Sequence, residues 1–244
     1  MKTFISLSNY PGSTGKYFYN KFFEYYNIDA VYIPKKSVNL KEDLEQAVLD
    51  KVSGISISMP FKQEVISYLD KKTANVEIYQ TCNTVKLENK LLVGYNADIA
   101  GLYQVSKFIK STDRITVLGL GAMASMFISY FEESHYGNLN ICARALNTWS
   151  NRHASSDVVI NCTSFGTATS DSPLEFIPPN TTLVIDLAIK NNKLEQQCIH
   201  NNVRYISGKE FYKFQFLQQF EIYTGIEPDT IAYDRFEQEL YEQI

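Results

Sequence analysis

The first part of the chain alternates between helical and extended hydrophobic patterns. Aromatic residues at Phe18, Phe22, Phe23 and Tyr26 recur at the spacing of one helix face, and the run DAVYIP after them is typical of a strand. Another helix is predicted from Asn39 through KEDLEQAVLDKV. The β-branched stretch GISISM that follows predicts a short, buried strand.

Pro60 comes directly after this strand. It suits the first position of a helix over FKQEVISYL, because its fixed φ matches a helix start and its missing N–H would be unpaired there. Farther on, TVKLENKLLVGYN predicts a β-hairpin with its turn near Glu88, Asn89 and Lys90. The first portion of the chain is therefore expected to be α/β with mixed strands.

From about residue 101 the alternation becomes more regular. RITVLGLG predicts a strand ending in glycines, and AMASMFISYFEE continues as a helix with Met123, Met126, Phe127 and Phe131 along one side. The strand-like runs NLNICAR, DVVINCT and TTLVIDLAI follow, then the helix KLEQQCIHNN and the strand VRYIS. Strands that alternate with helices predict a parallel sheet, the arrangement of nucleotide-binding domains. Two helical stretches, KEFYKFQFLQQFEIYTG and DTIAYDRFEQELYEQI, close the chain.

Composition narrows the classes of function. The 244 residues, 45% of them apolar, fit one large domain or two modest ones. A net charge of −4 with dispersed lysines and arginines leaves no basic stripe for nucleic acid. No apolar run approaches the roughly 20 residues that span a bilayer, and the first residues are too polar for a secretion signal, so a cytoplasmic location is expected. The scattered cysteines and histidines show no metal-ligand spacing, so we expect reduced core cysteines and no metal.

A glycine pair marks a candidate cofactor turn. Gly119 and Gly121 stand where a strand meets a helix, where backbone N–H groups and the helix dipole can hold a pyrophosphate. The third glycine of the usual fingerprint is absent, so a tight turn without a ligand is the alternative. Arg144, at the end of the next strand, stands where dinucleotide folds usually carry an acidic residue, and an arginine suits a 2′-phosphate. NADP is therefore favoured over NAD, unless Arg144 is only a solvated charge.

Five ordered blocks resemble the shikimate dehydrogenase family, in particular its divergent shikimate dehydrogenase-like branch. GISISMPFKQEV resembles the family's G-x-S-V-T-x-P-F-K block, with Ser58 in the threonine place and Lys62 as the catalytic lysine. CNTV is similar to the family's V-N-T and supplies Asn83. GYNADIAG is similar to G-Y-N-T-D-x-x-G and supplies Asp98. NCTSFGT resembles the segment beside the cofactor, and SGKEFYKFQFLQQFEIYTG resembles the closing motif with Gln215.

The resemblance implies an NADP-dependent enzyme that interconverts 3-dehydroshikimate and shikimate, with Lys62 and Asp98 as the catalytic pair. Ser58, Asn83 and Gln215 would bind ring hydroxyls, and Ser13 the carboxylate. The implied cofactor residues are Gly119, Gly121, Ala122, Arg144, Thr163, Ser164, Phe165 and Gly208. Three of these residues also have an ordinary structural interpretation: Lys62 as an exposed lysine, Asp98 as a helix cap and Gln215 as a solvent-facing glutamine.

Two stretches depart from the family pattern. The carboxylate motif Ser-x-Ser-Pro before His-Asn is matched by GSTGKYFYN, in which Gly15 replaces the second serine and Tyr19 and Asn20 stand for His-Asn. Only about a dozen residues separate Arg144 from DVVINCT, too few for the helix and strand usual there. The nucleotide domain is therefore expected to be abbreviated.

The expected architecture is α/β with two domains. Residues 1–100 plus 208–244 would form a substrate-binding domain with a mixed sheet, and residues 101–207 a Rossmann-like NADP-binding domain with a parallel sheet. A small-molecule substrate is expected, with no nucleic acid and no membrane partner, in a monomer or a homodimer. Quinate or another cyclic hydroxy acid is an alternative substrate, and a low-turnover ligand sensor is an alternative function.

Overall fold

The computed structural model describes residues 1–166, 171–189 and 192–242, and the chain divides into two compact units. Unit 1 comprises Met1–Ala97 and Gln215–Ile244, and unit 2 comprises Asp98–Phe214. Helix α7 (Gly208–Thr224) contains the second boundary between them. Of the domain ranges expected from sequence, residues 167–170, 190–191 and 243–244 lie outside the described residues.

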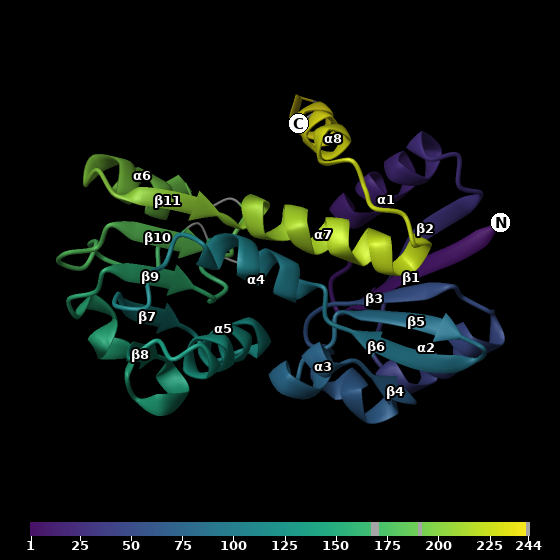
Figure 1. Cartoon of the computed structure of the whole chain (residues 1–244), viewed down its shortest axis with the longest axis horizontal. Coiled ribbons are helices and arrows are strands. Elements are labelled where there is room, and N and C mark those ends of the chain that lie inside the picture. The colour runs from purple at the N-terminus through teal and green to yellow at the C-terminus, as the bar shows by residue number, and fades with distance from the viewer. Residues whose placement is uncertain (167–170, 190–191, 243–244) are drawn as a thin grey trace. The chain divides into compact units, whose positions relative to one another are not determined.

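Unit 1 contains a mixed six-stranded sheet in the order β2-β1-β3-β5-β6-β4 (Figure 1). Its strands are β1 (Lys2–Ser8), β2 (Ala30–Lys36), β3 (Gly54–Ile57), β4 (Lys71–Lys72), β5 (Thr84–Glu88) and β6 (Leu91–Tyr95). Its helices besides the end of α7 are α1 (Thr14–Tyr25), α2 (Leu40–Leu49), α3 (Ala74–Tyr79) and α8 (Thr230–Glu242). The expected mixed sheet and the hairpin are confirmed, while strand β1, which lies between β2 and β3, was not predicted.

An aromatic core covers one face of this sheet. Helix α1 buries Phe18, Tyr19, Phe22 and Phe23, as the aromatic periodicity predicts. The ring centroids of Phe22 and Phe220 on α7 lie 5.3 Å apart in an edge-to-face contact. Burying one phenylalanine contributes about 2–3 kcal/mol, so these rings fasten α1 and α7 to the sheet.

The prediction of a helix starting at Pro60 is wrong. Residues 59–63 form a turn in which the Met59–Pro60 peptide is cis, and only a short 3₁₀ helix, η1 (Glu64–Tyr68), follows. The N–H of Phe61 donates to the carbonyl oxygen of Ser58 at 2.9 Å, which closes the turn. Lys62 therefore lies in a turn after β3 rather than in the first turn of a helix.

Unit 2 contains an all-parallel five-stranded sheet in the order β11-β10-β9-β7-β8 (Figure 1). Its strands are β7 (Arg114–Leu118), β8 (Asn138–Cys142), β9 (Val158–Asn161), β10 (Leu183–Asp186) and β11 (Arg204–Ser207). Its helices besides the start of α7 are α4 (Asp98–Ser106), α5 (Ala122–Glu133), α6 (Asn192–His200) and the short 3₁₀ helices η2 (Arg144–Leu146) and η3 (Trp149–His153).

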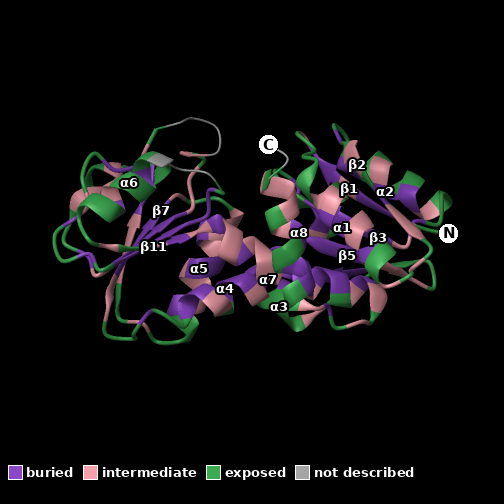
Figure 2. Ribbon diagram, turned by 90° about the horizontal axis from the view of Figure 1, so that it is seen from above, coloured by how far each residue is buried: buried purple, intermediate pink, exposed green. Residues whose placement is uncertain are grey.

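The connection between β8 and β9 is the abbreviated part. The 3₁₀ helices η2 and η3 occupy it, where a Rossmann fold carries a further helix and strand. The parallel sheet and the shortened connection are as expected from sequence. In Figure 2 the strands of each unit are largely buried, and exposed residues lie on loops and outer helix faces. None of the helices in the described part of the chain is long and apolar enough to cross a membrane.

Candidate functional site

One face of the unit 1 sheet changes from apolar to hydroxyl-lined toward the carboxyl ends of β1 and β3. Side chains two residues apart share a face, so Phe4 and Ser6 lie on the same side of β1. The parallel register places Gly54 beside Phe4 and Ser56 beside Ser6. Ser58 follows the end of β3 and is exposed. Ligands of α/β sheets bind outside the carboxyl ends of strands, so this end is the candidate substrate side.

Lys62 is partly exposed and lies in the turn that follows β3. Its carbonyl oxygen accepts a hydrogen bond of 2.8 Å from the N–H of Cys82. The Cys82 side chain is fully buried and belongs to the core below the turn. The turn that carries the lysine is thus anchored to the segment before β5.

Asn83 continues that anchor and is 3% exposed. Its Oδ1 accepts from the N–H of Ala97 at 2.8 Å and from the hydroxyl of Thr84 at 2.7 Å. An amide oxygen has two lone pairs, so Nδ2 is the group of this side chain that can donate to a ligand. Ala97 precedes Asp98, so the Asn83 side chain fixes the backbone that leads into α4.

Asp98 is the first residue of α4 and is 1% exposed. Within unit 2, α4 packs closely on the start of α7: a Cβ added at Gly101 would lie 2.5 Å from the carbonyl oxygen of Phe211. Only glycine permits this approach. The helix that begins with Asp98 is therefore packed against α7 at Gly101.

Gln215 lies on α7, and its Nε2 donates to Oε1 of Gln219 at 3.3 Å. Gln219, which was not singled out from the sequence, is 4% exposed. Its Oε1 also accepts from the hydroxyls of Tyr19 at 2.6 Å and Ser56 at 3.1 Å. Its Nε2 donates to the hydroxyl of Thr84 at 2.6 Å and to the carbonyl oxygen of Asn83 at 3.0 Å. We call Gln219 and these partners the Gln219 network.

The tyrosines around the Gln219 network are neutral hydrogen-bonding groups. Burial raises the pKa of Tyr19 and of Tyr223 well above the ordinary value, and it raises the pKa of Tyr32 to about 12. The hydroxyl of Tyr223 lies 3.0 Å from that of Ser56. Because phenols at such pKa values keep their protons, this part of unit 1 offers donors without adding charge.

Ser13 is the N-cap residue of α1 and is exposed. Its side chain makes no capping hydrogen bond, and it lines a cavity of about 400 Å³ with Lys16 and Lys21 among its neighbours. Asn20, farther along α1, bonds the backbone of β2: its Oδ1 accepts from the N–H of Tyr32 at 2.9 Å. Asn20 thus has a structural role in joining helix and strand.

In unit 2, a cavity of about 370 Å³ gathers most of the predicted cofactor residues. Gly119, Gly121, Arg144 and the run Thr163–Phe165 all line it. Gly119 has φ of +109°, and a Cβ there would lie 3.2 Å from the carbonyl oxygen of Cys162, so the turn requires glycine. Nothing lies within 4 Å of a Cβ placed on Gly121, which leaves the start of α5 open to an anion.

An aromatic pair forms one wall of this cavity. Trp149 stacks on Phe165 with ring centroids 6.1 Å apart and an interplanar angle of 10°. The guanidinium of Arg144 lies 5.6 Å from the centroid of Trp149 and 5.9 Å from that of Phe165. Trp149 was not predicted as a site residue, since it lies in the segment read only as a short connection.

Two predicted cofactor residues do not line the cavity. Ala122 is the first residue of α5, directly after the glycine turn. Gly208 is the buried first residue of α7, and a Cβ there would lie 2.5 Å from the carbonyl oxygen of Leu187. Its N–H donates to the carbonyl oxygen of Ala188 at 3.1 Å. The structure thus requires glycine at 208 for backbone packing.

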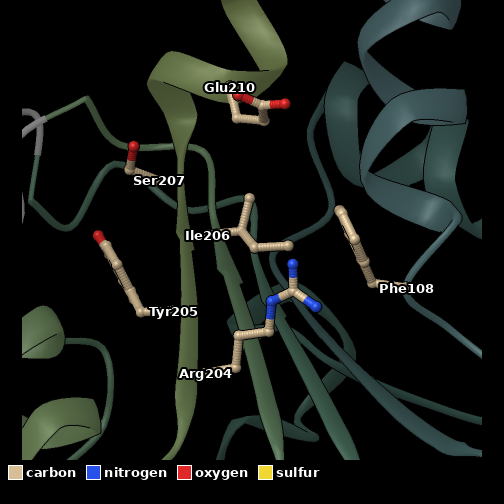
Figure 3. Close-up of a pocket in the computed structure, with 6 residues that line it drawn as sticks. All are labelled: Phe108, Arg204, Tyr205, Ile206, Ser207 and Glu210. Atoms are coloured by element: carbon tan, nitrogen blue, oxygen red, sulfur yellow. The ribbon is translucent and has the colours of Figure 1, made fainter.

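A second cavity of unit 2, of about 240 Å³, contains none of the predicted residues. Figure 3 shows Arg204 and Ile206 on one side of β11, toward Phe108, and Tyr205 and Ser207 on the other. The Arg204 guanidinium lies 3.9 Å from the Phe108 ring centroid. Across the described residues, no three histidine, cysteine, aspartate or glutamate side chains are grouped as metal ligands.

Comparison with known proteins agrees with this architecture. Residues 12–85 match the family model for the shikimate dehydrogenase substrate binding domain. A shikimate dehydrogenase-like protein of Haemophilus influenzae is 23% identical over 92% of this chain and 91% of its own. The chain is thus similar to a shikimate dehydrogenase-like protein along most of its length.

Two further comparisons extend this similarity. A shikimate dehydrogenase (NADP(+)) of Streptococcus pneumoniae is 25% identical over 89% of each chain. The Thermus thermophilus shikimate 5-dehydrogenase, solved in complex with NADP(H) and shikimate, shares the fold, with a TM-score of 0.82 over 98% of this chain and 99% of its own at 16% identity. The chain thus shares its fold with this solved enzyme.

Proposed function

We propose that this chain is an NADP-dependent oxidoreductase that interconverts 3-dehydroshikimate and shikimate, with Lys62 and Asp98 as its acid–base pair. One observation carries the proposal. The Cys82–Asn83 segment bonds both the carbonyl oxygen of Lys62 and the N–H of Ala97, the residue before Asp98. One buried segment of unit 1 therefore holds the backbone of Lys62 and the backbone of the residue that precedes Asp98.

Ketone reduction requires a proton at the oxygen that is becoming an alkoxide. When bound, NADPH supplies the hydride. The Lys62 ammonium donates the proton and stabilises the negative charge that develops on that oxygen. The Asp98 carboxylate accepts a hydrogen bond from the same hydroxyl or from Lys62, and so orients the reacting groups.

Neutral side chains suit the ring hydroxyls of the substrate. Ser58 provides a hydroxyl, Asn83 provides Nδ2, and Gln215 is positioned by its bond to Gln219. A site that bonds hydroxyls discriminates against an analogue lacking one, because its polar groups would lose their partners. Polyol recognition in this proposal rests on unit 1 and on α7.

NADP would be held by unit 2. The glycine turn at Gly119 and Gly121 and the start of α5 suit the pyrophosphate, and Arg144 suits the 2′-phosphate. Trp149 and Phe165 offer a flat apolar surface for the adenine. The Thr163–Phe165 run and Gly208 would lie along the remaining length of the cofactor. These roles correspond to a substrate domain of residues 1–100 plus 208–244 and a cofactor domain of 101–207.

Another cyclic hydroxy acid, such as quinate, is a second candidate substrate. The observation that favours it is the altered α1 start, where Gly15 replaces the family's second serine. The Tyr32 hydroxyl lies 3.7 Å from the position that a Cβ on Gly15 would occupy. A bulky phenol in place of a small serine hydroxyl changes the space available to the carboxylate end of a ligand.

The test is an NADPH absorbance assay with purified protein. 3-Dehydroshikimate, 3-dehydroquinate, NADPH and NADH are compared in all four pairings. We expect turnover with 3-dehydroshikimate and NADPH; preference for 3-dehydroquinate would select the second candidate. Ligand binding without turnover in any pairing would contradict the proposal and identify a sensor.

Binding of the cofactor can be followed without turnover. Trp149 is the single tryptophan of the chain, so its fluorescence reports on the cavity alone. NADPH should quench it, and energy transfer to the nicotinamide should appear. Calorimetry shows independently whether NADPH binds. If it binds and the tryptophan signal stays unchanged, the adenine does not contact Trp149 and Phe165.

A further inference from the structure

A cavity of about 330 Å³ lies at the amino end of the unit 1 sheet, the end opposite the candidate substrate side. Lys2 comes from the start of β1, Lys51 from the loop before β3, Lys86 from the middle of β5 and Lys90 from the hairpin turn. The volume is in the range of small-ligand sites, which begin at about 300 Å³. It is separate from every residue in the proposed reaction.

The charge of this cavity contrasts with that of the chain. Four lysines line it and no aspartate or glutamate does, while the whole chain carries a net charge of −4. Lys86 has one acidic neighbour, Glu88, with 3.8 Å between Nζ and Oε1. Such a long, half-exposed pair is weak, so it leaves the ammonium available to a ligand.

The floor of the cavity is apolar. Phe4 and Tyr223 are 1% and 4% exposed, and Val52 is 4% exposed. Val48 and Leu87, both partly buried, complete the apolar lining. An inorganic anion would use only the lysines, whereas a ring that carries a carboxylate would use the ammonium groups and the floor together.

Tyr223 joins this cavity to the Gln219 network. Its ring occupies the space in front of Gly54, where an added Cβ would lie 2.6 Å from Cε1. Its hydroxyl lies 3.0 Å from that of Ser56, which in turn donates to Gln219 at 3.1 Å. A ligand that packs on the Tyr223 ring therefore touches a side chain whose other end belongs to the network beneath Gln215.

We propose that this cavity is a second binding site, for an aromatic or carbocyclic carboxylate. The lysines bind the carboxylate, and Phe4, Val52 and Tyr223 contact the ring. The proposal does not depend on the proposed function, because it uses none of the catalytic or cofactor residues.

The test uses methyl NMR of the full chain with phenylpyruvate as probe. Pyruvate is the anion without a ring, and 4-phenyl-2-butanone is the ring without a charge. Phenylpyruvate should shift the methyl signals of Val52 and Leu87 and give nuclear Overhauser contacts from its ring to them. Both comparison compounds should bind at least about tenfold more weakly, because each lacks one of the two contributions.

A matched pair of double variants tests whether the lysines of this cavity bind the carboxylate of the probe. K86Q/K90Q should weaken phenylpyruvate binding about tenfold, since it removes two of four ammonium groups. K71Q/K72Q removes the same charge from exposed positions of β4 in the same unit and should bind as the unaltered chain does. Unperturbed methyl spectra away from the cavity establish that each variant is folded.

Three results would overturn the proposal. These are no shift at Val52 or Leu87 at millimolar probe, equal binding of pyruvate, and equal effects of the two double variants. A dehydrogenase assay that fails leaves the expected NMR result unchanged, so the two proposals fail separately.

Discussion

The polar groups below the carboxyl ends of the unit 1 sheet are buried and bonded to one another, whereas those around the unit 2 cavity are mostly exposed. Gln219 and Asn83 are 4% and 3% exposed and each makes several hydrogen bonds. Arg144, at the start of η2, and Gly121, in the turn before α5, are by contrast exposed. The difference teaches that unit 1 has hydrogen-bonding groups fixed in advance, while unit 2 offers a shaped backbone turn and a flat aromatic wall.

Lys62→Gln should produce the largest effect. Loss of the proton donor is expected to lower kcat by about 10²-fold or more, while shikimate still binds. Lys71→Gln, which removes another exposed lysine of unit 1, serves as the control and should leave kcat unchanged. Steady-state kinetics and calorimetric titration of shikimate measure the two quantities. Unaltered turnover in Lys62→Gln would remove this residue from the chemistry.

Gln219→Leu tests whether the unit 1 network is structural as well as functional. The change removes the acceptor of the Tyr19 hydroxyl and the donor to the Thr84 hydroxyl and the Asn83 carbonyl oxygen, at an expected loss of about 3 kcal/mol in the free energy of unfolding. Gln218→Leu, one residue earlier and partly exposed, should change it by less than about 0.5 kcal/mol. Urea denaturation measures both. Equal losses in the two variants would show that the Gln219 network contributes no more to the free energy of unfolding than a partly exposed glutamine does.

Arg144→Gln sharpens the comparison from the side of unit 2. Because Arg144 is exposed, we expect no change in unfolding but about tenfold weaker binding of NADPH, the value of one charge-assisted contact. Binding of NADH, which lacks the 2′-phosphate, should stay as it is and forms the internal control. Tryptophan fluorescence titration gives both constants. A parallel loss for NADH would assign Arg144 to the pyrophosphate or the adenine.

The smallest effect on stability is expected at Arg114, the first residue of β7 in unit 2. Arg114 donates from Nε and one terminal nitrogen to Asp157, each at 2.9 Å, and holds the pKa of this carboxyl at about 2 instead of 3.8. A lowered carboxyl pKa stabilises the fold at pH values above the ordinary pKa, and this contribution is lost as pH falls toward the lowered one. Asp157→Asn should therefore melt slightly below the unaltered chain at neutral pH and equally with it near pH 2. A difference in Tm that persists to pH 2 would contradict this account.

Much of the fold was predictable because hydrophobic periodicity records which face each element buries. The aromatic stripe of α1, the hairpin of β5 and β6, and the parallel strands of unit 2 all follow from it. β1 was not predicted because Ser6 and Ser8 interrupt its apolar pattern on the face that becomes polar toward the candidate site. The helix start at Pro60 was wrongly predicted because a proline suits a turn as well as a helix start, and local propensity does not choose between them.

The candidate site divides in the same way. The glycine turn, Arg144 and the Thr163–Phe165 run could be found because a turn and the segments after neighbouring strands are local features. Gln219 lies four residues after Gln215 on the same helix face, a spacing that could have drawn attention to it. Trp149 carried no such signal, since its role arises from a ring stacked on Phe165 across 16 residues of chain.

The sequence by itself determined the α/β class, most of the order of the elements and the glycine turn at Gly119 and Gly121, because these depend on neighbours along the chain. Tertiary structure alone decided that the Asn83 oxygen is used internally, that Gln219 joins α7 to the sheet, and that lysines from three distant segments line one cavity with an apolar floor. Such groupings depend on which strands become neighbours in a sheet. Since many sequences share one alternation of hydrophobic residues, that pairing is settled only when the whole core packs.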